Sequence, residues 1–275
     1  MKIKINSEFK WHIILMIFVI VSLFPIVFAI STSFKDLSEA YNNVFGIIPN
    51  NPTLNNYLEV FKRLPFTKIT SNTFFIATLV TVFKVITSVM AAYAFVYFDF
   101  KYKNILYFIL ISTIFIPFTV TMIPNYLTIS KLGFNDSLWG VILPQLSDAT
   151  GIFLLRQSMK TIPKSLIEVA EIEKVSHFKR IRDIIVPIVR PAIISTGIMF
   201  FINSWNEYVW PVLILKTKEN FTLPLALQLF ISSEGGTDFT IAMAVSVITM
   251  IIPLILYITF QKYIINTFTA SGIKG

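Results

Sequence analysis

The sequence contains no cysteine, so disulfide bonds and cysteine-ligated metal sites are excluded. Histidine occurs only twice: His12 borders a predicted membrane span, and His177 lies in a charged segment. A Ser/His protease inside the membrane or a histidine-ligated metal centre therefore lacks the residues that it would need. Charge is also scarce, because Asp, Glu, Lys and Arg make up 14% of the 275 residues, whereas soluble domains carry about 25%.

A phosphate-binding loop is missing too. No G-x-x-x-x-G-K-[ST] run occurs, and no glycine is followed directly by lysine. Active transport by this chain would therefore draw its energy from an ion gradient or from a separate ATPase. Gradient-driven carriers usually hold paired ionisable groups at mid-membrane, and the predicted spans offer only Lys84, Asp148 and Glu207. This small set favours a separate ATPase.

Apolar residues are abundant: the chain is 55% hydrophobic and its mean hydropathy is +0.73. The pattern predicts an all-α membrane protein with six transmembrane helices. A signal peptide is the alternative for the first apolar run, but that run is too long for a signal-peptide core. The transmembrane domain would cover residues 12–264, with tails at 1–11 and 265–275, and with spans at 12–33, 71–98, 105–129, 138–155, 192–215 and 239–263.

The distribution of Lys and Arg predicts the orientation. With the N-terminus inside, the inner segments hold fifteen of these residues and the outer loops hold seven. The positive-inside rule then places both termini and the charged segment 156–191 in the cytoplasm. Positive loops beside a membrane also explain the net charge of +8, so we expect no nucleic-acid partner.

The charged segment 156–191 is expected to fold into two short helices. Ser165 followed by Glu168 predicts a capping box at the first helix, and Ser176 would cap the second after a turn at 174–176. Pro187 and Pro191 are expected to end or bend the second helix. A solvated positive loop without any partner is the alternative. The first helix would show Leu166, Val169, Ala170 and Glu173 on one face, and the second would carry Phe178, Ile181, Ile184 and Ile185 at helical spacing.

The run EVAEIEKVSHFKRIRDIIVPIVRP resembles the EAA loop of inner-membrane permease subunits of ABC importers. Glu168, Val169 and Ala170 stand for the Glu-Ala-Ala of that loop, and Pro187 fits its end. Lys174 stands where the family has Gly, which is a departure. A left-handed Lys at that turn costs about 1 kcal/mol. The sequence therefore does not specify the form of this turn or its ATPase contact.

Other stretches resemble the carbohydrate permeases of this family, in its maltose/glycerol-3-phosphate-type, MalG-like branch. They are NNYLEVF from Asn55, AAYAFVYFDFKYKN from Ala91, FINSWNEYVWPVLIL from Phe201 to Leu215, and the tail TASGIKG. They occur in the family's order over most of the chain.

The resemblance implies a non-catalytic, multi-pass subunit in a bacterial cytoplasmic membrane. It would translocate a sugar or sugar derivative with a homologous second permease, two copies of a cytoplasmic ABC ATPase and an extracytoplasmic solute-binding protein. The chain would bind no cofactor, because ATP and Mg²⁺ would sit on the ATPase. Closure of the ATPase dimer would switch the spans from inward-facing to outward-facing. The expected ATPase-docking residues are Glu168, Val169, Ala170, Glu173, Lys174, Ser176, Phe178 and Pro187. For Glu168, pairing with a basic ATPase residue competes with a helix-capping role.

The fifth span holds the candidate substrate-path residues. Asn203, Asn206 and Glu207 recur on adjacent helical turns, and Trp205 or Trp210 would stack on a sugar ring. The alternatives are polar contacts between helices for the first three and an interfacial aromatic belt for the tryptophan. Rival functions are a gradient-driven secondary transporter, an ABC permease for a non-sugar solute, and a membrane scaffold that transports nothing.

Overall fold

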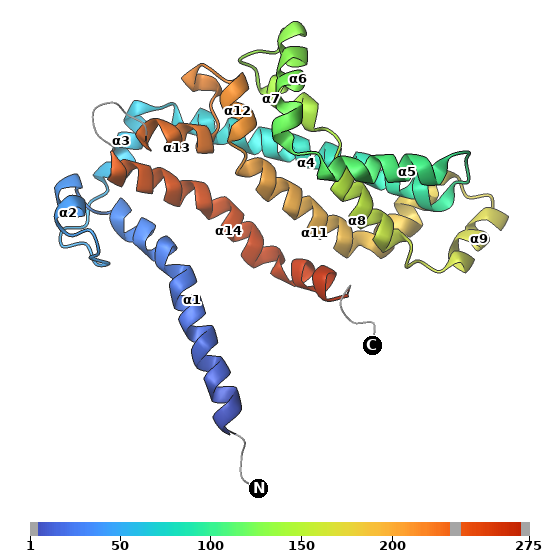
Figure 1. The fold of residues 1–275 in the computed structure, drawn as a ribbon, viewed down its shortest axis with the longest axis horizontal. Helices are drawn as coiled ribbons and strands as arrows, with labels where there is room; N and C mark the ends of the chain where they lie inside the picture. The colour runs from blue at the N-terminus through green and yellow to red at the C-terminus, as the bar shows by residue number, and fades with distance from the viewer. Residues whose placement is uncertain (1–4, 232–237, 271–275) are drawn as a thin grey trace. The chain divides into compact units, whose positions relative to one another are not determined.

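The computed structural model describes residues 5–231 and 238–270, and every regular element in these two ranges is a helix. Figure 1 shows them as a ribbon. The predicted all-α fold class is thereby confirmed. The chain divides into two compact units, residues 1–66 with 225–251 and residues 67–224 with 252–275.

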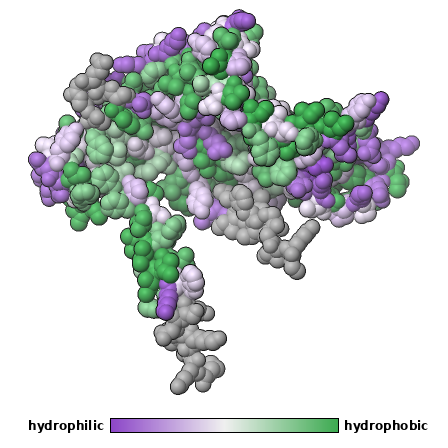
Figure 2. All heavy atoms as spheres, in the orientation of Figure 1, coloured by the Kyte–Doolittle hydropathy of each residue, from purple (hydrophilic) through white to green (hydrophobic). Residues whose placement is uncertain are grey.

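Four helices are long and apolar enough to cross a membrane, and they cover Phe9–Ser33, Phe66–Tyr97, His177–Trp205 and Phe239–Tyr263. Two bent helix pairs bring the number to six if each pair is one span. Large apolar side chains are exposed along these helices, as the green surface in Figure 2 shows. Such a surface suits lipid or another membrane subunit as its surroundings.

The third predicted span is broken into two helices. Helix α5 (Lys103–Ser112) continues as the 3-10 turn η1 (Thr113–Phe115), and α6 (Phe118–Lys131) follows at 99°. Pro117 explains the break, because a proline disfavours the helical conformation in the preceding residue. Ile116 is accordingly extended, with φ −81° and ψ 114°. Pro124 lies inside α6 without interrupting it.

The fourth span is bent by 44° between α7 (Leu138–Ile142) with η2 (Leu143–Gln145) and α8 (Ala149–Met159). Asp148 begins α8, since its Oδ1 accepts hydrogen bonds from the backbone N–H of Thr150 at 2.9 Å and of Gly151 at 3.4 Å. This carboxylate therefore satisfies two of the free N–H groups at the helix start.

The fifth span differs from the prediction at both ends. A continuous helix runs from α10 (His177–Lys179) through the π-helical segment η3 (Arg180–Ile185) into α11 (Val186–Trp205). Pro187 and Pro191 were expected to end or bend the second loop helix. They do not end it. Pro187 comes just after η3, Pro191 lies inside α11, and the helix continues past both. After α11, residues 209–214 form a separate helix, α12 (Val209–Ile214).

In the first unit, α1 (Ile5–Ser33) leads into the short helices α2 (Leu37–Asn42) and α3 (Asn55–Arg63). Lys35 is fully buried, and its ammonium donates to the carbonyl oxygens of Asn43 and Gly46, just after α2. Asn56 donates to the carbonyl oxygens of Ser33 and Lys35, both at 2.8 Å. The segment after α1 is thus a folded element.

Helix α13 (Leu223–Ile231) precedes α14 (Phe239–Ala270), which continues seven residues beyond the predicted end of the sixth span. Helix α1 likewise begins inside the predicted N-terminal tail. Residues 1–4 and 271–275, which include most of the TASGIKG tail, lie outside the described residues.

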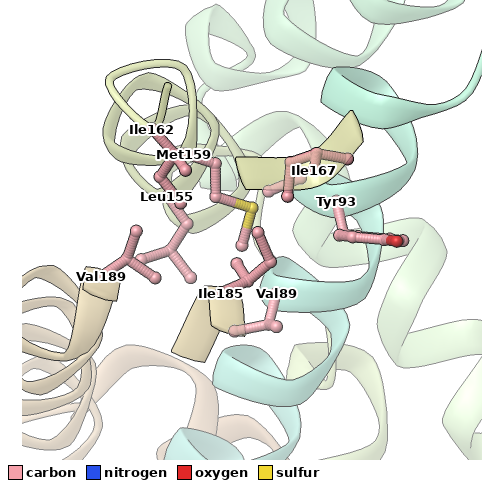
Figure 3. Close-up of a cluster of buried hydrophobic side chains, with 9 residues drawn as sticks. Val89, Tyr93, Leu155, Met159, Ile162, Ile167, Ile185 and Val189 are labelled. Atoms are coloured by element: carbon pink, nitrogen blue, oxygen red, sulfur yellow. The ribbon is translucent and has the colours of Figure 1, made fainter. Parts of the chain in front are cut away.

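The second unit is built on α4 (Phe66–Tyr97), which packs with α8 and α11. Their shared core also takes in the short helix α9 (Lys164–Ile172). Figure 3 shows its buried side chains converging from all four helices. The labelled residues are Val89, Tyr93, Leu155, Met159, Ile162, Ile167, Ile185 and Val189.

Candidate functional site

Helix α9 lies at one end of the second unit (Figure 1), where hydrophilic residues gather on the surface in Figure 2. It begins at Lys164, directly after Pro163, which is itself non-helical with φ −58° and ψ 131°. Ser165 is therefore already the second helical residue, and no side chain makes a cap hydrogen bond at Pro163. The predicted capping box of Ser165 with Glu168 is wrong, because Pro163 starts the helix earlier than the box requires.

The two faces of α9 differ in how far they are exposed to solvent. Ile167 and Ala170 are buried, and Ile167 points into the core beside Met159 (Figure 3). The sequence pattern predicted that Ala170 and Val169 share one face. In the structure Ala170 is buried and Val169 is exposed. The outward side chains are apolar as well: Val169 is 54% exposed and Ile172 is 80% exposed. Leu166, Val169, Ile172 and the neighbouring Phe178 form what we call the α9–α10 patch, and Glu168 and Glu173 are exposed beside it.

The turn after α9 keeps the form that a glycine would give it. Lys174 is left-handed, with φ 53°. The N–H of Val175 bonds to the carbonyl oxygen of Ala170 at 2.9 Å and closes the turn. Lys174 thus occupies the conformation that the resemblance assigns to Gly, at a cost of about 1 kcal/mol.

Arg180 holds this turn together, and the sequence analysis gave it no role. Its Nε donates to the carbonyl oxygen of Val175 at 2.7 Å, and its guanidinium pairs with Glu171 at 2.8 Å. Arg180 is buried, whereas the Glu171 side chain is 55% exposed. The nine-residue spacing of the pair crosses the turn, so helical periodicity alone gave no signal for it.

The second helix of the loop is attached to α4. Ser176 stands at its N-cap, but its hydroxyl makes no cap hydrogen bond. Nδ1 of His177 lies 3.0 Å from the hydroxyl oxygen of Tyr93, and its ring meets Phe98 edge-on at 4.7 Å. Phe178 points outward and is exposed. The α9–α10 patch is therefore carried by a firmly packed support.

The candidate substrate-path residues separate into two kinds. Asn203 and Asn206 are exposed, and Asn206 donates to the carbonyl oxygen of Ile202 in its own helix at 3.0 Å. Oε1 of Glu207 accepts from the N–H of Trp210 at 3.2 Å, which stabilises the start of α12. Trp205 is 0% exposed, and its ring stacks on Phe201 with centroids 5.7 Å apart. In this structure Trp205 packs the core and offers no face to a sugar ring.

Two ionisable residues of the predicted spans meet. Nζ of Lys84, in α4, lies 3.1 Å from Oδ2 of Asp148 and 5.1 Å from the centre of the Phe200 ring on α11. The side chains of Lys84 and Asp148 are 15% and 26% exposed. The pair thereby joins α4, α8 and α11. In the described ranges, no three His, Cys, Asp or Glu side chains come together as metal ligands.

The sequence pattern of one family, the binding-protein-dependent transport system inner membrane component, matches residues 84–269, more than half of the chain. The chain belongs to this permease family. The matched range contains α9, its turn and the π-helical segment, so the α9–α10 patch is part of the family's common region. The permease is a multi-pass membrane protein of the inner membrane.

Relatives and a solved structure extend the likeness over nearly the whole permease. The arabinooligosaccharides transport system permease protein AraQ of Halalkalibacterium halodurans is 30% identical over 259 residues, which are 93% of this chain and 92% of AraQ. The sn-glycerol-3-phosphate transport system permease protein UgpE of Yersinia pestis is 30% identical over 262 residues, 93% of either chain. A chain of a bacterial ABC transporter involved in alginate import shares the fold, with a TM-score of 0.84, 23% identity, and coverage of 96% and 99%.

Proposed function

We propose that the permease is one membrane subunit of an ATP-driven, binding-protein-dependent ABC importer for a sugar or sugar derivative. The similarity to AraQ and UgpE over 93% of the chain supports a substrate of this class. A homologous second permease, a pair of ATPases and an extracytoplasmic solute-binding protein would complete the importer. ATP and Mg²⁺ would be bound by the ATPases, and this chain would hold no cofactor.

The observation that carries the proposal is the α9–α10 patch. Four apolar side chains are exposed on two short helices that are themselves anchored by Arg180 and by the Tyr93–His177 contact. A rigid apolar surface beside exposed carboxylates suits a water-soluble protein partner, since burying one such side chain is worth about 1.5–3 kcal/mol. The partner that fits is the ATPase. Glu168 and Glu173 would pair with basic residues at the rim of that interface.

The same proposal places α9 and both termini in the cytoplasm, as the surplus of Lys and Arg predicts. The absence of cysteine permits a clean test. A single cysteine in place of Ser165 should react with a membrane-impermeant maleimide only in inside-out vesicles. A single cysteine in place of Lys131 should react in intact spheroplasts. The opposite result would invert the proposed orientation.

Docking is tested by co-purification from a detergent extract with an affinity tag on this chain. We compare the wild type with the double variant Leu166→Ala/Val169→Ala and with Glu168→Lys. The matched control, Val120→Ala/Ile123→Ala, removes the same kinds of side chain at the same spacing from the exposed surface of α6. We expect the wild type and the control to bring down the ATPase and a second permease, and the loop variants to lose only the ATPase.

Retention of the ATPase by both loop variants would refute docking at the α9–α10 patch. Sugar uptake by cells tests the energy source. Inhibition by vanadate supports the ATP-driven importer, whereas insensitivity to vanadate with collapse by a protonophore would favour the gradient-driven alternative.

A further inference from the structure

A groove of about 940 Å³ lies at the end of the second unit that carries α9. Its walls are the end of α4, the start of α5, the end of α8 and the inner side of α9. Helix α4 ends here and α5 begins here, so the groove lies at the boundary between membrane and water. It is distinct from the α9–α10 patch, because Leu166, Val169, Ile172 and Phe178 do not line it.

Four cations and three carboxylates line the groove. Three carboxylates are present, but Asp99 is paired with Lys103 at 3.4 Å and Glu171 is paired with Arg180 at 2.8 Å. Glu168 is the third. The other cations that line the groove are Arg156, Lys160 and Lys164, and in the described part of the chain none of the three has an acidic partner within ion-pair distance.

Arg156 is the most enclosed of these cations. Its guanidinium lies over the Tyr107 ring at 3.8 Å, and its Nε is buried with no hydrogen-bond partner among the described residues. This Nε is too enclosed to reach a ligand in the groove, but Arg156 lines the groove and its guanidinium has no acidic partner among the described residues. A phosphate oxygen is the acceptor that a guanidinium binds best.

One part of the groove lining is apolar. Phe95, Phe100 and Ile105 line it, and the surface continues along α5 through Leu106, Phe108 and Ile109, all of them exposed. A ligand here would contact cations at one end and an apolar helix surface at the other. That division matches a phospholipid, whose headgroup is charged and whose chains are apolar.

We propose that this groove binds the phosphate of an anionic phospholipid headgroup, with Arg156, Lys160 and Lys164 as its cationic contacts and the apolar surface of α5 along the acyl chains. The lipid would touch Ile167 of α9, on the inner side of the helix whose outer side is the α9–α10 patch. The site would adjust the position of α9. It goes beyond the proposed function, since lipid binding requires neither sugar nor ATPase.

The test uses the full-length chain, purified in detergent with the subunits that stay bound to it. Native mass spectrometry measures retention of added palmitoyl-oleoyl phosphatidylglycerol, with phosphatidylcholine of the same chains as the neutral reference. The variant Lys160→Gln/Lys164→Gln changes two exposed side chains and leaves the Arg156–Tyr107 contact in place. The matched control is Lys216→Gln/Lys218→Gln, which removes the same charge from an exposed loop.

We expect the groove variant to bind phosphatidylglycerol about 25-fold more weakly than the wild type, because each of the two lysines near an anionic headgroup is worth about fivefold. The control and the charge-preserving variant Lys160→Arg/Lys164→Arg should bind as the wild type does. Equal retention by the groove variant, or equal retention of phosphatidylcholine, would overturn the proposal. Displacement of the lipid by an excess of inorganic phosphate would assign the groove to a soluble phosphate instead. ATPase co-purification is measured in a separate experiment. A failure of lipid binding can therefore be told apart from a failure of ATPase docking.

Discussion

The ion pair of Lys84 and Asp148 predicts a large, non-additive effect on stability. Replacing Lys84 by Met leaves the Asp148 carboxylate with only its two backbone N–H donors. Replacing Asp148 by Asn keeps a side-chain acceptor at the start of α8 but leaves the ammonium with only the Phe200 ring. Both variants isolate one charge where its side chain is 15% or 26% exposed.

The magnitude follows from this partial burial. Removing one partner of a fully buried pair costs about 3–5 kcal/mol, and the remaining exposure puts each single variant near the lower end, at about 3 kcal/mol. The double variant Lys84→Met/Asp148→Asn removes both charges and should cost less than about 1.5 kcal/mol. At roughly 2 °C per kcal/mol for a chain of this size, each single variant should lower the apparent Tm by about 6 °C.

The assay heats the full-length protein in detergent and follows the fraction that stays monodisperse. Lys101→Met is the matched control, because Lys101 lies over the Tyr102 ring at 4.9 Å but is exposed; its Tm should change by less than about 1 °C. The reasoning is refuted if the losses of the two single variants add up in the double variant, since additivity would mean that the charges do not interact.

Three further predictions concern single positions. Lys174→Gly should raise stability by about 1 kcal/mol by relieving the left-handed conformation, measured as a higher apparent Tm, and a lower Tm would show that the turn is not left-handed. Gly151→Ala should lower the Tm by several degrees, because a Cβ there would come within 2.5 Å of a phenyl carbon and a serine hydroxyl; unchanged stability would contradict this packing. For Asp136, burial pushes the pKa upward, but hydrogen bonds from the N–H groups of Lys216 and Thr217 outweigh it and hold the pKa below its usual value. The stability that Asp136 gives should therefore be full at neutral pH and be lost as the pH falls through that lowered pKa. Asp136→Ala should abolish this acid-side loss and cost about 1–2 kcal/mol at neutral pH, whereas a titration identical to that of the wild type would contradict it.

The sequence predicted the helical class and the two-helix loop because these follow from local patterns. Six apolar segments specify membrane helices, and the polar interval between the fourth and the fifth of them specifies a loop. Lys174 is instructive: the local pattern predicted a turn at 174–176, but only the resemblance to the EAA loop pointed to a left-handed residue there, a conformation that lysine otherwise avoids. Contacts between distant segments were not predictable in this way. Tyr93 and His177 are 84 residues apart, and neither residue carries a local signal for the other.

Helix breaks and side-chain facing were the other weak points. Pro117 and Pro124 look alike in the sequence, yet the chain turns by 99° before α6 and passes straight through Pro124. Their effect depends on whether the preceding residue is free to extend, which packing decides. Trp205 was expected to face a sugar, but α11 is apolar all round, so periodicity could not tell its inner face from its outer face.

The π-helical segment η3 sets how far the side chains of α10 are rotated about the helix axis relative to those of α11. A π-helical turn accommodates an additional residue compared with an α-helical turn, and each residue of an α-helix rotates the chain by about 100°. The side chains of α10 are therefore offset by about 100° from the directions that a regular extension of α11 would give them. If one residue of η3 were deleted, an α-helix would form there and His177 would turn away from Tyr93. The direction in which Phe178 points, relative to the face that α11 shows inside the membrane, thus depends on the presence of one residue between Arg180 and Ile185.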